Sequence, residues 1–114
     1  MGEIRRGDVV LAAAAGGYGK PRPWLVVQVD RYNNLERPGS VLACPFTTHH
    51  EPAAYRISID LPAGDTQRQS WVTVDKLMAI KRERIGARIA SASAQQLEAV
   101  EHAMMALLGL GTDD

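Results

Sequence analysis

The segment Trp24-Leu25-Val26-Val27-Gln28-Val29 is an apolar run interrupted only by Gln28. Its length is that of a typical strand, and its branched and aromatic residues suit extended structure. A short run that is apolar at nearly every position is typical of a strand buried on both faces. We therefore predict a buried strand here, around which the other elements are arranged.

Shorter segments of strand character lie on both sides of this run, at residues 7–12, 41–45, 55–59, 71–74 and 85–89. Pro45 is expected to end its strand or to mark a bulge, because proline cannot donate a ladder hydrogen bond. Residues 76–80 are expected to form a turn or a helix. Residues 16–21, with three glycines before Pro21, are expected to form a flexible loop.

The C-terminal part has a helical pattern. Ser93 followed by Gln96 forms a capping box, which predicts a helix that starts at Ala94. An apolar stripe at spacings of three and four follows, made of Leu97, Val100, Met104, Leu107 and Leu108. Strands at short spacing followed by one helix predict a mainly β fold, a small barrel that the helix closes or covers.

Length and composition restrict the class of protein. With 114 residues, the chain is expected to form one domain over 1–114. It contains no apolar run of the ~18 residues that a membrane span needs, and no signal-peptide pattern. The single Cys44 excludes an internal disulfide and suits a reducing compartment. These features predict a cytoplasmic protein without a membrane segment.

The formal net charge is zero, with 13 basic and 13 acidic residues, which argues against nucleic-acid binding. The distribution is uneven, however, because Arg68 to Arg88 carries six basic and two acidic residues, a balance of +4. A neutral chain can still present a local basic face. The alternative is that these charges form an ordinary solvated surface.

Several enzyme templates are not matched. Residues 16–20 lack the spacing of a phosphate-binding P-loop and the Ser or Thr after its lysine. His49 and His50 are adjacent, so on a strand they would point to opposite faces, and they make a poor pair of metal ligands. Cys44 lies in an apolar run and is expected to be a small core residue. No metal and no cofactor is predicted.

Arg22 and the cluster Thr47-Thr48-His49 remain as candidates for chemistry. Arg22 stands between Pro21 and Pro23, which restrict the backbone on both sides of it. A guanidinium with a nearby hydroxyl suits phosphate, since the planar fork binds two oxygens and the hydroxyl adds a donor. The alternative is a surface arginine beside threonines of an ordinary turn.

Four motifs follow one another along the chain: Arg6-Gly7-Asp8-Val9-Val10, Arg22-Pro23-Trp24-Leu25-Val26-Val27, Val41-Leu42-Ala43-Cys44-Pro45-Phe46-Thr47-Thr48 and Val74-Asp75-Lys76-Leu77-Met78-Ala79-Ile80. In their order and spacing they resemble the MazF/PemK (also Kid) family of toxins from type II toxin-antitoxin systems. The resemblance extends from Arg6 to Leu110.

The resemblance implies an SH3-like barrel of the CcdB/MazF/PemK type that forms a homodimer and binds single-stranded RNA. It implies a metal-independent endoribonuclease that leaves 2′,3′-cyclic phosphate and 5′-hydroxyl ends and is inhibited by a cognate antitoxin. Arg22, Thr47 and Asp75 align with catalytic positions of the family: Arg22 would stabilise the transition state, and Thr47 would hydrogen-bond the scissile phosphate. Their sequence neighbours Lys20, Thr48 and His49 are expected to contact RNA.

Two other functions remain open. A toxin of the same fold could poison gyrase, as CcdB does, but that activity is associated with a Trp-Gly-Ile ending, and residues 109–114 read Gly-Leu-Gly-Thr-Asp-Asp. A non-catalytic SH3-like interaction module is the second alternative.

Overall fold

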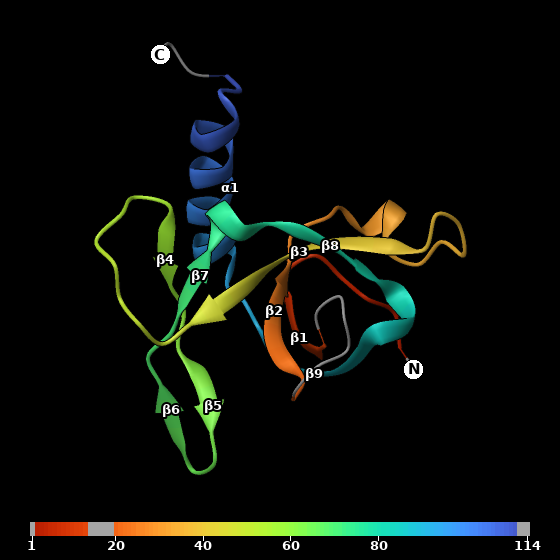
Figure 1. Cartoon of the computed structure of the whole chain (residues 1–114), viewed down its shortest axis with the longest axis horizontal. Coiled ribbons are helices and arrows are strands. Elements are labelled where there is room, and N and C mark those ends of the chain that lie inside the picture. The colour runs from red at the N-terminus through yellow and green to blue at the C-terminus, as the bar shows by residue number, and fades with distance from the viewer. Residues whose placement is uncertain (1, 14–19, 112–114) are drawn as a thin grey trace.

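The computed structural model describes residues 2–13 and 20–111, so most of the predicted glycine-rich loop lies outside the described residues (Figure 1). In these described residues, strands and short 3-10 helices (η) precede one α-helix. In chain order the elements are β1 (Asp8–Ala12), β2 (Arg22–Val26), η1 (Asp30–Tyr32), β3 (Ser40–Thr47), β4 (Arg56–Ser58), β5 (Leu61–Ala63), β6 (Thr66–Arg68), β7 (Trp71–Thr73), η2 (Val74–Lys76), β8 (Met78–Lys81), η3 (Arg82–Arg84), β9 (Ile85–Ser91) and α1 (Ala94–Leu108).

The apolar run at 24–29 forms the middle of the main sheet, whose strand order is β4-β7-β3-β2-β1-β9. β2 is antiparallel to β1 on one side and to β3 on the other. Trp24, Leu25 and Val26 are at most 4% exposed, which confirms the predicted buried strand. Burial ends before Val29, which is 46% exposed because the chain leaves the sheet there and turns into η1.

The sheet is open. Among the described strands, β4 and β9 lie at opposite ends of the order and do not pair with each other. Helix α1 contacts β4 and η2 (Figure 1). The predicted mainly β fold with a C-terminal helix is confirmed, but the strands do not close into a barrel.

Strand β3 changes partner at its middle. Residues 40–43 pair with β8, whereas Phe46 and Thr47 pair with β7. Pro45, which has no N–H to donate, lies between these two ladders and still pairs with Trp24 on the other side. Its carbonyl accepts a hydrogen bond from the Thr73 hydroxyl at 2.7 Å. The strand therefore continues through Pro45, contrary to the predicted end, although the proline does mark a change of pairing.

Two segments differ from the sequence-based expectation. Residues 76–80 were expected to form a turn or helix, but most of them form β8, stabilised by the ladder to β3. Residues 61–68, for which no element was predicted, form the hairpin β5–β6, a two-stranded sheet of its own. Its turn is Gly64-Asp65, where Gly64 has a φ of +64° that favours glycine.

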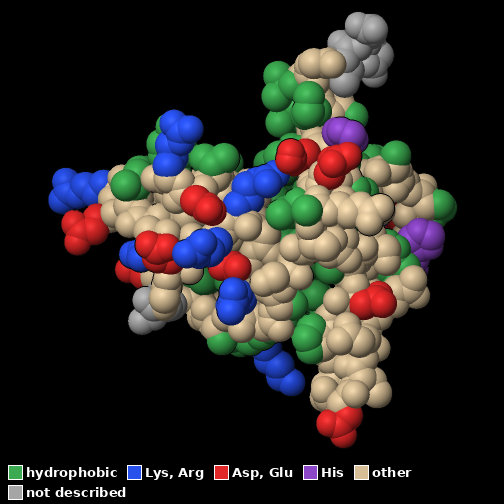
Figure 2. Space-filling view, turned by 180° about the vertical axis from the view of Figure 1, so that it is seen from behind, with side chains coloured by type: hydrophobic (Ala, Val, Ile, Leu, Met, Phe, Trp, Pro, Cys, Tyr) green, Lys and Arg blue, Asp and Glu red, His purple; other side chains and the backbone are tan. Residues whose placement is uncertain are grey.

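Helix α1 starts where the sequence predicts. The Ser93 side chain accepts from the Gln96 backbone N–H, and the Gln96 side chain accepts from the Ser93 N–H. Val100 is buried, but Leu107 and Leu108 are 43% and 59% exposed. Only the first part of the predicted apolar stripe is therefore covered, and Figure 2 shows hydrophobic side chains along the projecting end of the helix. In the described part of the chain, no helix is long and apolar enough to cross a membrane.

Candidate functional site

A pocket of 810 Å³ opens where β2 and β3 face the hairpin β5–β6. We call it the Arg22 pocket. Its polar lining consists of Arg22, Thr47, Thr48, Arg68 and Ser70. Its apolar lining includes Trp24, Pro45, Phe46, Leu61 and Ile89. Residues from five of the described strands, β2, β3, β5, β6 and β9, therefore meet at one concave surface.

Strand register explains why Arg22 and Thr47 lie together. β2 and β3 pair Trp24 with Pro45. Two residues earlier on β2 is Arg22, and two residues later on β3 is Thr47, so the same antiparallel register places these two residues opposite each other. Because side chains alternate between faces, both lie on the face of the sheet that Trp24 and Pro45 share. Trp24 fixes this end of β2, because it is buried and its indole N–H donates to the Ala12 carbonyl at 3.1 Å.

The end of β3 is held by local contacts. Thr47 pairs with Trp71 of β7, and its hydroxyl oxygen accepts a hydrogen bond from the His49 backbone N–H at 3.1 Å. The His50 ring stacks on Trp71 with 4.7 Å between ring centroids. A threonine hydroxyl that accepts one bond can still donate its own hydrogen. Thr47 is therefore positioned to donate to a group in the pocket.

The lining of the Arg22 pocket has the chemistry that suits an anion. Two of its lining residues are arginines and three carry hydroxyl groups, and no aspartate or glutamate from the described ranges lines it. Neither Arg22 nor Arg68 forms an ion pair with any residue in those ranges. An exposed guanidinium without a carboxylate partner offers its full set of donors to phosphate oxygens.

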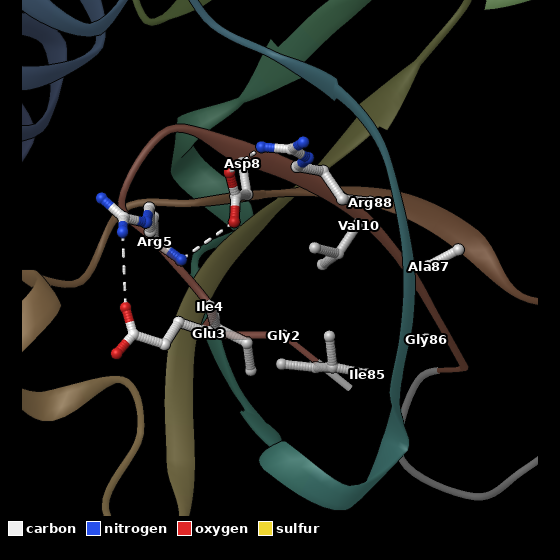
Figure 3. Close-up of a pocket in the computed structure, with 10 residues that line it drawn as sticks. All are labelled: Gly2, Glu3, Ile4, Arg5, Asp8, Val10, Ile85, Gly86, Ala87 and Arg88. Atoms are coloured by element: carbon white, nitrogen blue, oxygen red, sulfur yellow. Dashed lines mark hydrogen bonds and ion pairs between the residues drawn. The ribbon is translucent and has the colours of Figure 1, made fainter.

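A second pocket, of 430 Å³, lies between the N-terminal segment and β9 and has a different charge pattern (Figure 3). There the charged side chains pair with one another: Arg5 with Glu3 at 3.4 Å, and Arg88 with Asp8 at 3.7 Å. Asp8 also accepts from the Arg5 backbone N–H at 2.9 Å. Both arginines that line this pocket are therefore already paired with a carboxylate and are less available to an external anion.

The basic residues of the 68–88 segment do not form one face around the Arg22 pocket. Arg68 alone of them lines it, whereas Arg88 pairs with Asp8 beside the other pocket. In Figure 2 the Lys and Arg side chains are interspersed with Asp and Glu. The basic side chains that line the Arg22 pocket are therefore Arg22 and Arg68, and the other basic residues of this segment lie outside it.

Asp75, predicted to be catalytic, lies in η2 and does not line the Arg22 pocket. Its carboxylate accepts two hydrogen bonds from Arg56, from Nε at 3.0 Å and from a terminal nitrogen at 3.2 Å. We call this pair the Arg56 corner. It joins the start of β4 to η2, so the structure places Asp75 in a bidentate ion pair rather than beside Arg22.

The three residues predicted to contact RNA are placed differently from one another. Thr48 lines the Arg22 pocket, whereas Lys20 and His49 are exposed and do not. His49 Nε2 lies 3.8 Å from a Glu51 carboxylate oxygen, a contact that becomes an ion pair when the imidazole is protonated. Both residues lie close in sequence to lining residues and remain predictions as RNA contacts.

Arg68 and Ser70 were not singled out by the sequence analysis. The Ser70 hydroxyl is held in place because it donates to the Arg68 carbonyl at 3.2 Å. The signal that could have found them is Gly64-Asp65, a two-residue turn of the type that connects hairpin strands. A hairpin centred on that turn pairs Arg68 with Leu61.

Cys44 is fully buried in the core, as predicted. Burial, with a smaller contribution from the negative charge of Asp75, raises the pKa of its thiol to about 12. The thiol is therefore protonated at neutral pH and is not a nucleophile. No cluster of three or more His, Cys, Asp or Glu side chains suited to a metal occurs in residues 2–13 and 20–111.

The sequence matches the family described as "PemK-like, MazF-like toxin of type II toxin-antitoxin system" over residues 5–108. A curated relative, the probable endoribonuclease MazF of Mycolicibacterium smegmatis, is 34% identical over 110 residues, with 94% of this chain and 98% of the relative covered.

Solved structures agree with this match. The MazE–MazF structure from Deinococcus radiodurans has a TM-score of 0.74 at 26% identity and covers 96% of this chain and 100% of its own. An endoribonuclease from a mycobacterial species has a TM-score of 0.78 at 18% identity, covering 99% of this chain and 98% of its own, and shows the shared fold. The resemblance found in the sequence is confirmed, and the chain belongs to the PemK-like, MazF-like toxin family of type II toxin-antitoxin systems.

Proposed function

We propose that this chain is the toxin of a type II toxin-antitoxin system and acts in the cytoplasm as an endoribonuclease on single-stranded RNA. The observation that carries the proposal is the Arg22 pocket, which Arg22 and Thr47 line together and which no carboxylate of residues 2–13 and 20–111 lines. The similarity to a probable endoribonuclease, the MazF of M. smegmatis, supports the same activity.

The chemistry proposed for this pocket is a transesterification within the RNA strand. The 2′-oxygen loses its proton and bonds to the adjacent phosphorus, while the bond from phosphorus to the 5′-oxygen breaks and that oxygen gains a proton. The products are a 2′,3′-cyclic phosphate and a 5′-hydroxyl. Negative charge builds on the phosphorane oxygens, where a preorganised guanidinium stabilises the transition state. Arg22 takes this role, and Thr47 donates a hydrogen bond to the same phosphate.

The other predicted residues take supporting roles in the proposal. Thr48 lines the Arg22 pocket beside Thr47 and contacts the RNA backbone. Lys20 and His49 are exposed next to these segments and attract the flanking strand. Asp75 acts as a positioning residue, because its ion pair with Arg56 fixes η2, which follows β7 directly.

An assay on a mixed RNA, with and without EDTA, tests the proposal. Cleavage is expected to proceed equally under both conditions and to leave cyclic phosphate and 5′-hydroxyl ends. Loss of cleavage in EDTA, restored by Mg²⁺, would refute a metal-independent reaction. Absence of cleavage under both conditions would favour the alternatives, a gyrase-poisoning toxin of the CcdB type or a non-catalytic interaction module, which a gyrase supercoiling assay separates.

The proposal includes two protein partners, a second copy of the chain and a cognate antitoxin. Open sheet edges and the exposed Leu107 and Leu108 on α1 favour pairing, and two-fold dimers are the commonest form of assembly. Similarity to the D. radiodurans MazF, which was solved together with MazE, supports an antitoxin partner. An acidic antitoxin segment would place carboxylates at Arg22. Sedimentation of a stable monomer, or RNA binding unaffected by a bound antitoxin, would contradict these assignments.

A further inference from the structure

We infer that the hairpin β5–β6 carries a second phosphate site, at Arg68, for an RNA phosphate adjacent to the one at Arg22. The inference rests on the proposed function and adds a binding residue to the Arg22 pocket. It divides the pocket into two phosphate sites on separate elements, Arg22 on β2 and Arg68 on β6.

Hairpin register directs Arg68 toward the pocket. Leu61 of β5 is 5% exposed and belongs to the hydrophobic core, so its side chain marks the inner face of the hairpin. Arg68 pairs directly with Leu61, and directly opposed residues of an antiparallel pair project on the same face. The neighbouring Gln67, which pairs with Pro62, projects on the opposite face.

The charge of Arg68 is available to a ligand. Two aspartates lie on or next to the hairpin, Asp60 and Asp65, but no ion pair joins either to Arg68 among the described residues. Neither aspartate lines the Arg22 pocket. Arg68 is exposed, so an incoming phosphate does not have to displace a protein partner.

The remaining lining favours two phosphates over one. Arg22 and Thr47, which lie together, supply enough hydrogen-bond donors to bind one phosphate, so Arg68 is left for another. The pocket also has apolar walls, which include Pro45, Phe46 and Leu61. Apolar surface framed by two cations matches a nucleoside flanked by two phosphates. The volume of 810 Å³ lies within the range of about 300–1,000 Å³ typical of small-molecule sites.

A binding experiment separates this site from ordinary surface charge. The probe is a short single-stranded 2′-O-methyl RNA of mixed sequence, which lacks the attacking hydroxyl and so stays intact. Arg68→Gln is expected to weaken its binding about tenfold, as loss of a charge-assisted hydrogen bond predicts. The slope of log affinity against log salt should become shallower by about 0.7, the contribution of one phosphate on a single strand.

Three matched variants serve as controls. Arg31→Gln removes the same charge from η1, outside the Arg22 pocket, and should leave affinity and slope unchanged. Gln67→Ala alters the neighbouring residue of the same strand, which does not line the Arg22 pocket, and should also bind normally. Arg68→Lys keeps the charge and should retain the slope. If Arg68→Gln has the RNA affinity and salt slope of the wild type, or loses no more than Arg31→Gln does, the second phosphate site is refuted.

Position is tested with RNA in which one phosphate at a time is replaced by an uncharged methylphosphonate. The wild-type protein should bind more weakly when either of two adjacent phosphates is replaced. For the Arg68→Gln variant, replacing one of these two phosphates should no longer change the affinity, and for Arg22→Gln the same should hold for the other phosphate. If both variants become insensitive at the same phosphate, the two arginines hold one phosphate and the inference fails.

Kinetics give an independent readout. A residue that binds substrate and transition state alike changes KM and leaves kcat nearly constant. Arg68→Gln should therefore raise KM about tenfold on the cleaved RNA, whereas Arg22→Ala should lower kcat. If the wild type cleaves and Arg68→Gln has normal KM, only the second site fails. If the wild type neither binds nor cleaves RNA, the proposed function and the second site fail together.

Discussion

Arg22 and Arg56 have the same place in two strands, since each is the first residue of its strand. Arg56 is enclosed: its side chain is 12% exposed and its guanidinium is bound bidentately by Asp75. Arg22 is exposed and has no carboxylate partner in the described ranges. Strand position therefore does not determine whether an arginine is held in an ion pair. The presence of a carboxylate within reach of its guanidinium does.

The largest effect is expected from Arg22→Ala. Removing a preorganised donor to the phosphorane costs about 3–4 kcal/mol of transition-state stabilisation, or roughly 10²–10³ in rate. Folding should hardly change, because no ion pair joins Arg22 to the rest of the described structure. Single-turnover cleavage and thermal unfolding measure the two quantities. A variant that cleaves near the wild-type rate would remove Arg22 from the mechanism.

Substitutions at the Arg56 corner should lower the stability of the fold rather than the cleavage rate. Arg56→Gln and Asp75→Asn each break a bidentate pair that is mostly shielded from water, and each should lower the free energy of unfolding by about 1.5–3 kcal/mol. Cleavage rates should stay within a few-fold of the wild type. Denaturant titrations of both single variants and the double variant give the coupling between the two residues.

The pair of variants also decides the role of Asp75. If Asp75 only positions η2 through Arg56, the two single variants should have equal, small effects on kcat. A large loss of kcat in Asp75→Asn, with normal kcat in Arg56→Gln, would make Asp75 a catalytic residue and erase the contrast between the two regions.

The smallest effect is expected from Thr47→Ala. A neutral hydrogen bond contributes about 0.5–1.5 kcal/mol, so the rate should fall by a few-fold to about tenfold. Thr47→Ser keeps the hydroxyl that accepts from the His49 N–H and should restore most of the activity. If Thr47→Ser were as slow as Thr47→Ala, the methyl group rather than the hydroxyl would matter, and Thr47 would belong to the packing of the pocket.

Elements that local sequence specifies were predicted. The buried strand at Trp24 to Val26 follows from its apolar run, and the start of α1 follows from the capping box of Ser93 and Gln96. The meeting of Arg22 with Thr47 was expected from the family motifs. The register of β2 on β3 supplies the physical reason for it.

Features that depend on long-range pairing were not predicted. Met78 to Lys81 is a strand because β3 offers it a partner, a fact that its own residues do not encode. Whether the sheet closes depends on pairing among β4, β8 and β9, each of which has one strand partner in the described structure, and local sequence does not specify that pairing. The ion pair of Asp75 with Arg56 was not predicted, because the two residues lie 19 positions apart, and the catalytic role that the resemblance implies for Asp75 stays a prediction. The sequence pattern did not predict the hairpin β5–β6, because strands of three residues each are too short to show an alternating pattern.

The hairpin β5–β6 is packed against the core at its base and exposed at its tip. Leu61, at its base, is packed in the core. Among the described strands, β5 and β6 pair with each other and with no third strand, and the tip at Gly64 and Asp65 is exposed. A two-stranded ribbon is marginally stable by itself in water. We therefore expect this ribbon to open locally before the main sheet unfolds, with hydrogen exchange of its backbone amides as the measurement. Because Arg68 lies on this ribbon, RNA bound as proposed should slow that exchange.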